Sequence, residues 1–313
     1  MRKATGMTPV FDRLALIGLG LIGSSIAHAA RRGGLAREIV GYARSQETRD
    51  TAARLGFLDT VADSATAAAA GADCVVLCVP VGVIGAVTRE IAGSLVPGAI
   101  LSDVGSVKAA VIAQALPHLP DHVHLVPAHP LAGTEESGPE SGFAELFDDR
   151  WCIVTPLPTT PPEQVARVRA FWEGLGSQVD TMDAAHHDRV LAVTSHVPHL
   201  IAYSIVGTAS DLETVTESEV VKYSASGFRD FTRIAASDPT MWRDVFLHNR
   251  EATLEVLGRV TEDLFALQRA IRWGDGEALF KRFTETRAIR RGIVEAGQDT
   301  ARPNFGRGKP REV

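Results

Sequence analysis

The sequence has few cysteines and lacks any long apolar run. Cys74, Cys78 and Cys152 are its three cysteines among 313 residues, and each lies in a strand-like segment, which favours buried thiols over disulfides or a catalytic thiol. No segment approaches the roughly 20 consecutive apolar residues of a membrane span. The first seven residues also lack the apolar core of a signal peptide. These absences predict a cytoplasmic protein.

Runs of basic residues are absent as well. The formal net charge is −6, which argues against nucleic acid or an anionic membrane as the main partner. A local cluster of arginines can still bind one negative ligand. With 45% hydrophobic and 22% charged residues, the chain has the composition of a globular protein of about two domains, not of a fibrous or disordered one.

The most informative stretch runs from Arg13 to Ala30 and reads RLALIGLGLIGSSIAHAA. An apolar strand-like run breaks at a GxGxxG turn and resumes with helical spacing, which is the order of a dinucleotide-binding site. Gly18 permits the tight turn, Gly20 lets backbone amides approach a pyrophosphate, and Gly23 lets the helix pack close to the strand. The N-terminus of the helix then favours the anionic diphosphate.

The first half of the chain alternates strand-like and helix-like segments. Strands are predicted at 14–17, 38–42, 73–80, 99–103, 124–128, 151–155 and 178–182. Helices are predicted directly after Gly23 and at 46–55, 64–70, 81–95 and 163–175. The near-continuous apolar run at 73–80 suits a strand buried on both faces, as in a parallel sheet. This alternation predicts a doubly wound α/β sheet that binds ligands at the carboxyl ends of its strands.

The choice between NAD and NADP is determined at the end of the second predicted strand. An acidic residue there would bind the adenosine ribose, but this sequence has Arg44 and Ser45, and its first carboxylate is Glu47. A guanidinium binds phosphate in a bidentate manner, so Arg44 tilts the prediction slightly towards NADP. The alternative is that Arg44 stacks on the adenine or stays in solvent.

Strand-like patterns end near Asp183, and the rest of the chain is predicted to be helical. The predicted helices span 184–209, 212–223, 239–273 and 277–296. Ser237 or Asp238 can cap the helix at 239–273, and Gly274 follows its end. An apolar stripe on this helix is either core within the domain or a dimer interface. It comprises Leu257, Val260, Leu264, Leu267 and Ile271.

Three polar clusters are candidates for chemistry. Ser106 lies in SDVGSVK, at the carboxyl end of a predicted strand that faces the cofactor cleft. His129 ends another predicted strand, and an imidazole is the simplest general base near neutral pH. In the helical half, His196 and His199 share one helix face, and Arg229 and Arg233 share another.

Both pairs on the helices have a second interpretation. The histidine spacing suits a metal ion, but no further ligands occur at matching spacing, so no metal site is predicted. The two arginines can bind a substrate carboxylate, or they can form a solvated salt-bridge face with Asp230. His129 taken alone is as compatible with a structural role as with a catalytic one.

Five separated motifs resemble those of the prephenate and arogenate dehydrogenases of tyrosine biosynthesis. They occur in order between Arg13 and Ile293 as GLGLIGSS, DVGSVK, HPLAGTEESG, SHVPHL and GFRDFTRIA with the following SDPTMWRD. The resemblance implies a Rossmann-type nucleotide-binding domain at 1–183 and an all-α substrate and dimerisation domain at 184–297. The active site would lie between the two domains, and the protein would be a homodimer. The tail at 298–313 is predicted to be mobile from its composition of proline, glycine and alternating charges.

The resemblance also implies roles for single residues. His129 would take the proton of the ring hydroxyl. Ser106 and His199 would be the neighbours that orient His129. Arg233 would bind a substrate carboxylate. The remaining substrate-binding candidates are Arg229 and His196. The NAD(P) site would comprise Gly18, Gly20, Leu21, Ile22, Gly23, Arg44, Ser45, Val79, Pro80 and Ser106.

The implied reaction is the oxidative decarboxylation of prephenate, and the motifs do not separate prephenate from arogenate. Glu135 offers a carboxylate to the ammonium of arogenate, but the resemblance places it nearer the cofactor. Two other functions remain open. A β-hydroxyacid dehydrogenase needs a lysine in its helical domain, where Lys222 lacks the glycine-rich surroundings of that family. In a noncatalytic NAD(P) sensor, nothing would require His129, Ser106 and Arg233 to meet in one cleft.

Overall fold

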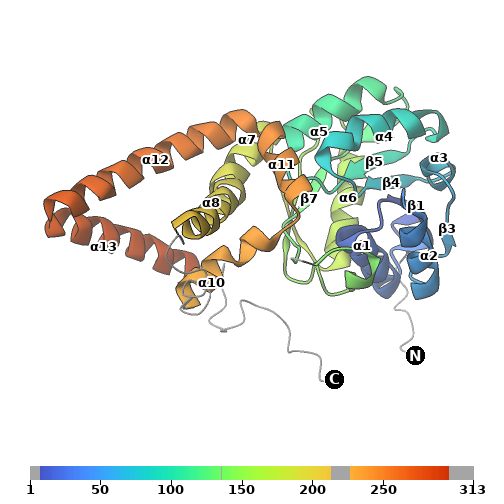
Figure 1. Cartoon of the computed structure of the whole chain (residues 1–313). Helices are drawn as coiled ribbons and strands as arrows, with labels where there is room; N and C mark the ends of the chain where they lie inside the picture. Colours follow the sequence, from blue (N-terminus) through green and yellow to red (C-terminus); the bar gives the residue numbers. More distant parts are fainter. Residues whose placement is uncertain (1–7, 135, 213–225, 296–313) are drawn as a thin grey trace. The chain divides into compact units, whose positions relative to one another are not determined.

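The computed structural model describes residues 8–134, 136–212 and 226–295 (Figure 1). These residues form two compact units, one ending at Leu254 and one beginning at Glu255. The domain boundary predicted at residue 183 therefore lies within the first unit. Glu135, Lys222, the tail at 298–313 and nearly all of the helix predicted at 212–223 lie outside the described residues.

The core of the first unit is a six-stranded parallel sheet in the order β3-β2-β1-β4-β5-β6. Its strands are β1 (Phe11–Ile17), β2 (Ala36–Tyr42), β3 (Thr60–Val61), β4 (Cys74–Leu77), β5 (Ile100–Asp103) and β6 (His124–Leu125). This is the strand order of dinucleotide-binding sheets, in which the ligand crosses the point where the order reverses, here between β1 and β4. The predicted Rossmann-type fold is confirmed.

Helices cover both faces of this sheet, as the continuous burial of residues 14–17 in β1 requires. Leu14 and Leu16 pack on the face covered by α1 (Leu21–Gly33) and α6 (Pro162–Leu175). Ala15 and Ile17 pack on the other face. That face is covered by α3 (Ala65–Ala69), α4 (Ile84–Ile91) and α5 (Lys108–Ala115). The predicted helix at 81–95 is α4 with a short 3-10 turn at each end.

One helix of the first unit, α2 (Gln46–Leu55), begins and ends where its capping residues predict. This helix begins after Ser45, whose hydroxyl accepts a hydrogen bond from the backbone N–H of Thr48. It ends at Gly56, where φ is 69° and a side chain would be strained. The range at 46–55 predicted from the sequence is therefore confirmed.

The predicted strand at 124–128 is wrong, because the chain changes sheets at Pro127. Val126 still donates to the carbonyl of Leu101 in β5, but Pro127 has no N–H, and its carbonyl accepts from Thr155. The chain thus leaves β6 and forms β7 (Ala128–Pro130) in a second, three-stranded sheet. Its other strands are β8 (Trp151–Val154), antiparallel to β7, and β9 (Gln178–Thr181), parallel to β8.

A continuous helical run follows β9 in the first unit. It consists of α7 (Ala184–Leu191), a π-helical turn (Ala192–His196) and α8 (Val197–Leu212), so the predicted helix at 184–209 is confirmed. Residues Ala184–Asp211 are long and apolar enough to cross a membrane, a criterion that core helices of soluble proteins also meet. Buried polar side chains on this run, those of His187 and His196, bond to other elements of the unit.

The predicted helix at 239–273 is wrong in one respect, because it is divided at Asn249. Asp238 caps α11 (Pro239–His248) by accepting from Met241, as predicted. α12 (Arg250–Trp273) then begins after Asn249, whose backbone leaves the helical region at φ −108° and ψ 39°. The side chain of Asn249 is buried and bonded to the α7–α8 run, which holds this residue in place.

The second unit consists of the larger part of α12 and of α13 (Gly276–Ile293). Arg282 of α13 forms an ion pair with Asp263 of α12 at 2.9 Å. Large apolar side chains on both helices are exposed in the single chain; they include Leu264, Phe265, Ile271, Trp273, Phe280, Phe283 and Ile289. The predicted stripe is therefore not intradomain core throughout, since Leu264 and Ile271 are both more than half exposed.

Candidate active site

The glycine-rich turn between β1 and α1 fits a bound pyrophosphate. A Cβ on Gly18 would lie 2.2 Å from the carbonyl oxygen of Cys78, and a Cβ on Gly23 would lie 2.0 Å from that of Gly18. Gly20 has open space where its side chain would be, and no side chain caps the N-terminus of α1. No acidic residue lies in the first turn, so the amides of Leu21, Ile22 and Gly23 are open to an anion.

Other cofactor candidates surround this turn at the carboxyl ends of the strands. Arg44 is exposed just past β2, and Ser45 uses its hydroxyl to cap α2. Val79 and Pro80 directly follow β4, next to the turn at Gly18. The end of β2 carries no carboxylate, so nothing at this position repels a 2′-phosphate.

The carboxyl end of β5 is tied to the second sheet by a buried ion pair. Lys108 donates to Asp103 at 2.5 Å and to the carbonyl of Ala128 at 2.7 Å. Burial lowers the pKa of Lys108, and the charge of Asp103 opposes this effect. Because Ala128 precedes His129, the ion pair fixes the backbone that carries the candidate base.

His129 lies in β7, at the wall of a cavity of about 480 Å³. The cavity is lined by His129, Pro130, Leu131, Ala132, Gly133, Thr134, Leu191, Thr194, Ser195, His199, Arg233, Ile234, Ser237, Met241 and Trp242. Only 7% of His129 is exposed, and burial lowers its pKa well below 6.5, assisted by the neighbouring His187, Lys108 and His196. His129 is therefore neutral at physiological pH, as a base must be.

The cavity brings together three of the predicted site residues from three elements. His199 on α8 stacks on Trp242 of α11 with 3.7 Å between ring centroids, and its Nδ1 bonds to the carbonyl of Ser195. Arg233 lies beside it in the 3-10 turn that precedes α11, and its charge contributes to lowering the pKa of His199. Burial is the larger cause of that shift.

Two of the predicted substrate-binding residues do not line this cavity. His196 is fully buried behind it and accepts a hydrogen bond from the Asn249 amide at 3.0 Å. Its Nε2 is buried near the backbone of Ser106 without a full hydrogen bond. Arg229 is exposed on α10 (Ser226–Thr232). Ser106 thus lies against His196 rather than in the cavity wall.

The sequence analysis missed His187 and Asp188 as partners of the candidate base. His187 Nε2 lies 2.9 Å from His129 Nδ1, and His187 Nδ1 lies 2.8 Å from Asp188 Oδ1. Neither residue lies in one of the three polar clusters that the sequence indicates. No local pattern in α7 marks them as facing inward, since four polar residues follow one another at 186–189, and their contact with His129 requires the folded chain.

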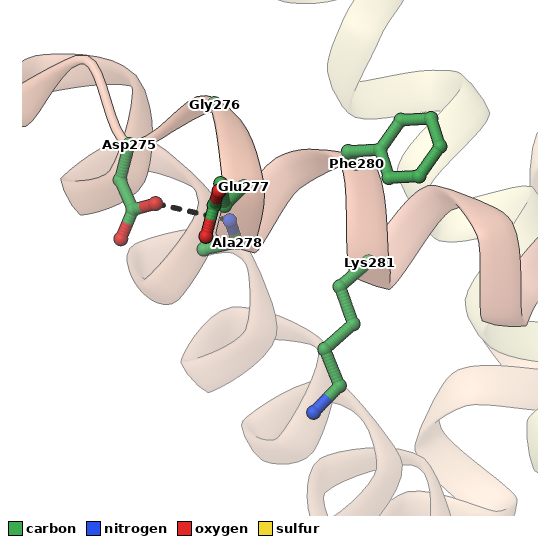
Figure 2. Close-up of a pocket in the computed structure, with 6 residues that line it drawn as sticks. All are labelled: Asp275, Gly276, Glu277, Ala278, Phe280 and Lys281. Atoms are coloured by element: carbon green, nitrogen blue, oxygen red, sulfur yellow. Dashed lines mark hydrogen bonds between the residues drawn. The ribbon is translucent and has the colours of Figure 1, made fainter.

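Another hollow, of about 580 Å³, lies at the start of α13 (Figure 2). Figure 2 shows Asp275 accepting from the backbone of Ala278, which caps the helix, and Phe280 and Lys281 extending from the same helix in different directions. Both side chains line the hollow. None of the predicted site residues lines it. Within 8–134, 136–212 and 226–295, no group of three His, Cys, Asp or Glu side chains is placed to hold a metal ion.

The predicted buried thiols are confirmed. Cys74 and Cys152 are buried, Cys78 is half-buried, and all three are free. Burial raises the pKa of each thiol, so none is a ready nucleophile.

A Rossmann sheet with an open glycine turn, followed by helices that complete a cavity around a neutral histidine, defines a nucleotide-dependent oxidoreductase. The comparisons agree. Residues 26–181 match the family described as "Prephenate dehydrogenase, nucleotide-binding domain", and residues 183–285 match "Prephenate dehydrogenase, dimerization domain". The chain therefore belongs to the prephenate dehydrogenase family, and its Rossmann domain binds NAD(P).

Relatives of known name extend over most of the chain. A cyclohexadienyl dehydrogenase of Zymomonas mobilis is 44% identical over 281 residues, covering 90% of this chain and 96% of that protein. A prephenate dehydrogenase of Bacillus subtilis is 33% identical, covering 92% and 77%. The crystal structure of Aquifex aeolicus prephenate dehydrogenase with hydroxyphenyl propionate and NAD+ matches with a TM-score of 0.83 and 32% identity, covering 93% of this chain and 100% of that one.

Proposed function

We propose that this chain catalyses the NAD(P)-dependent oxidative decarboxylation of prephenate to 4-hydroxyphenylpyruvate, a step of tyrosine biosynthesis, and that it also accepts arogenate. The observation that carries this proposal is the neutral, buried His129 in the wall of a cavity shared with His199 and Arg233. The ligands of the Aquifex aeolicus relative, a hydroxyphenyl acid and NAD+, support the same chemistry.

His129 is the proposed base. Its Nδ1 is bonded to His187, which leaves Nε2 for the ring hydroxyl of the substrate. When bound, NAD(P) supplies the nicotinamide that accepts the hydride from C4 of the ring. As the hydride leaves, His129 Nε2 takes the hydroxyl proton, the bond from C1 to its carboxylate breaks, and the electron pair completes the aromatic ring. Carbon dioxide departs, and His129 returns the proton to the phenolate oxygen, so no net proton is released.

The other proposed site residues bind and orient. The guanidinium of Arg233 is suited to a substrate carboxylate, since such charge-assisted pairs are bidentate. His199 is held rigidly by Trp242 and Ser195 and orients the ring hydroxyl. Ser106 and His196 lie together behind the cavity, and we propose that they support its wall. Arg229, exposed in the single chain, is proposed to reach the site of a second subunit.

The proposed protein is a cytoplasmic homodimer. The match to a dimerization domain and the exposed apolar side chains of α12 and α13 support this assembly. Sedimentation velocity would give the mass of two chains in solution. A monomer at micromolar concentration would contradict the proposal.

Steady-state kinetics test the function most directly. The increase in absorbance at 340 nm is followed for prephenate and arogenate, each with NAD and NADP. We expect turnover of prephenate with both cofactors, since Arg44 tolerates a 2′-phosphate, and we expect R44D to shift the preference towards NAD. A preference of the wild type for NAD above a hundredfold, about 2.7 kcal/mol, would contradict the role of Arg44. Absence of any reduction with prephenate would contradict the activity itself.

A further inference from the structure

A row of buried polar side chains continues from the candidate base into the interior. It consists of His129, His187 and Asp188, joined by contacts of 2.9 Å and 2.8 Å. His187 is fully buried and Asp188 nearly so. Since buried polar groups persist only where their hydrogen bonds are satisfied, each contact constrains which nitrogen carries a proton.

The carboxylate at the inner end fixes the protons of both imidazoles. Asp188 can only accept, so His187 Nδ1 carries the proton that it donates. A neutral His187 then has its lone pair on Nε2, which accepts from His129 Nδ1. A neutral His129 therefore carries its proton on Nδ1, and its lone pair lies on Nε2, the atom that must act as base.

Asp188 is itself held by the start of another helix. Its Oδ1 accepts from the backbone N–H of Lys108 at 2.8 Å and its Oδ2 from that of Ala109 at 2.9 Å. These are the first two residues of α5, where Val107 provides no side-chain cap. The positive end of the helix dipole further favours the ionised carboxylate. Asp188 thus caps α5 from α7 and cannot turn away from His187 without breaking these bonds.

We propose that His187 and Asp188 are positioning residues that hold His129 in the tautomer with a protonated Nδ1, so that Nε2 faces the substrate as a base. This inference rests on the proposed role of His129. The contact also stabilises the transient imidazolium, because His129 Nδ1–H continues to donate to His187 while the charge is present.

The charges around this row are consistent with a neutral resting state. Lys108, paired with Asp103, faces both imidazoles, and His196 faces both from the π-helical turn. Burial lowers the pKa of His187 also, and the neighbouring Asp188 opposes that shift. Both histidines are therefore neutral near pH 7, which is the condition for the donor and acceptor pattern described above.

Two variants of His187 separate orientation from packing. H187F removes the acceptor for His129 Nδ1, whereas the side-chain oxygen of H187Q can replace it. We expect H187F to lower kcat about 10²-fold, the upper range for loss of an orienting partner of this kind, with KM within about 2-fold. We expect H187Q to recover kcat to within about 10-fold of the wild type. H186F is the matched control, because His186 is the exposed neighbour on the same helix.

Each outcome bears on the proposal. Native kcat in H187F, or equal loss in H187F and H187Q, would overturn it. If H187F does not fold, as judged by thermal melting, H187Q and ¹⁵N NMR of histidine-labelled full-length protein still decide. The His129 signals, identified by their loss in H129N, must show a protonated Nδ1 in the wild type. A His129 protonated on Nε2 would overturn the inference. Because this measurement needs no turnover of prephenate, it distinguishes a failure of the inference from a failure of the proposed activity.

Discussion

His129 combines the two properties that a base needs, a neutral resting state and an Nε2 that makes no hydrogen bond to the residues the structure describes. We expect H129N to lower kcat by about 10² to 10⁴, the usual contribution of general base catalysis, and to leave prephenate binding nearly intact. Single-turnover kinetics with a separate binding titration measure the two effects. A variant with near-native kcat would remove His129 from the mechanism.

Arg233 is expected to act on binding rather than on the chemical step. R233A removes a charge-assisted contact worth about 1.5 to 3 kcal/mol, so KM should rise roughly 10- to 150-fold while kcat changes less. R243A is a suitable control, because Arg243 pairs with the adjacent Asp244 of α11 and does not line the cavity. An unchanged KM in R233A would instead direct attention to Arg229.

Contacts between distant elements explain why the sequence identified part of the site and not the rest. His129, His199 and Arg233 lie in local motifs, and the fold brings them to one cavity. His187 is 58 residues from His129 in the chain, and Asp188 is 80 residues from the Lys108 amide that it accepts from. No local periodicity encodes such pairs.

At the scale of elements, Asp188 links α7 to the N-terminus of α5. D188N replaces a carboxylate that accepts from two backbone amides and from His187 by a group with one acceptor oxygen. We expect the free energy of unfolding to fall by about 2 to 3 kcal/mol in urea titrations. The control is D183N, because Asp183 caps α7 at an exposed position where asparagine is an equivalent cap. Equal stability of the two variants would contradict the link.

Element boundaries were predictable where the signal was local. Ser45 and Gly56 delimit α2, and Asp238 with Pro239 begins α11. The change of sheet at Pro127 was only partly encoded locally. Proline cannot donate within a sheet, which signals a break, but only the backbone partners show that the chain passes from β6 to β7 in a second sheet. The break at Asn249 has the same origin, since it depends on hydrogen bonds to residues 53 and 61 positions away.

At the scale of the whole molecule, the buried histidines make stability depend on pH. The folded state lowers the pKa of His196 from 6.5 to about 4, with burial as the largest cause. The unfolded chain therefore binds this proton first, and stability falls as the pH decreases from about 6.5 towards 4. A pKa difference of one unit corresponds to about 1.36 kcal/mol. Over the full pH range, the titration of His196 alone therefore lowers the free energy of unfolding by about 3 kcal/mol.

Urea unfolding at pH 7.5 and pH 5 measures this dependence. H196Q should reduce the difference between the two values, because the residue that titrates is gone. H186Q should leave it unchanged, since His186 is exposed. A difference of the same size in wild type and H196Q would assign the pH dependence to other groups.

The π-helical turn at Ala192–His196 fixes a rotational phase between the two ends of its helix. One residue corresponds to about 100° around an α-helix axis, and the wider π turn accommodates one extra residue. The residues beyond it are therefore rotated by that angle from where an uninterrupted α-helix of the same sequence would place them. His187, before the turn, faces His129, and His199, after it, stacks on Trp242. An uninterrupted α-helix of the same sequence would leave His187 in place and swing His199 about a quarter of a revolution out of the cavity. Deleting Val193, which is 57% exposed, would instead close the turn into an ordinary α-helix and keep both histidines in their present directions. The wide turn thus sets the directions in which a single helix presents His187 to His129 and His199 to Trp242.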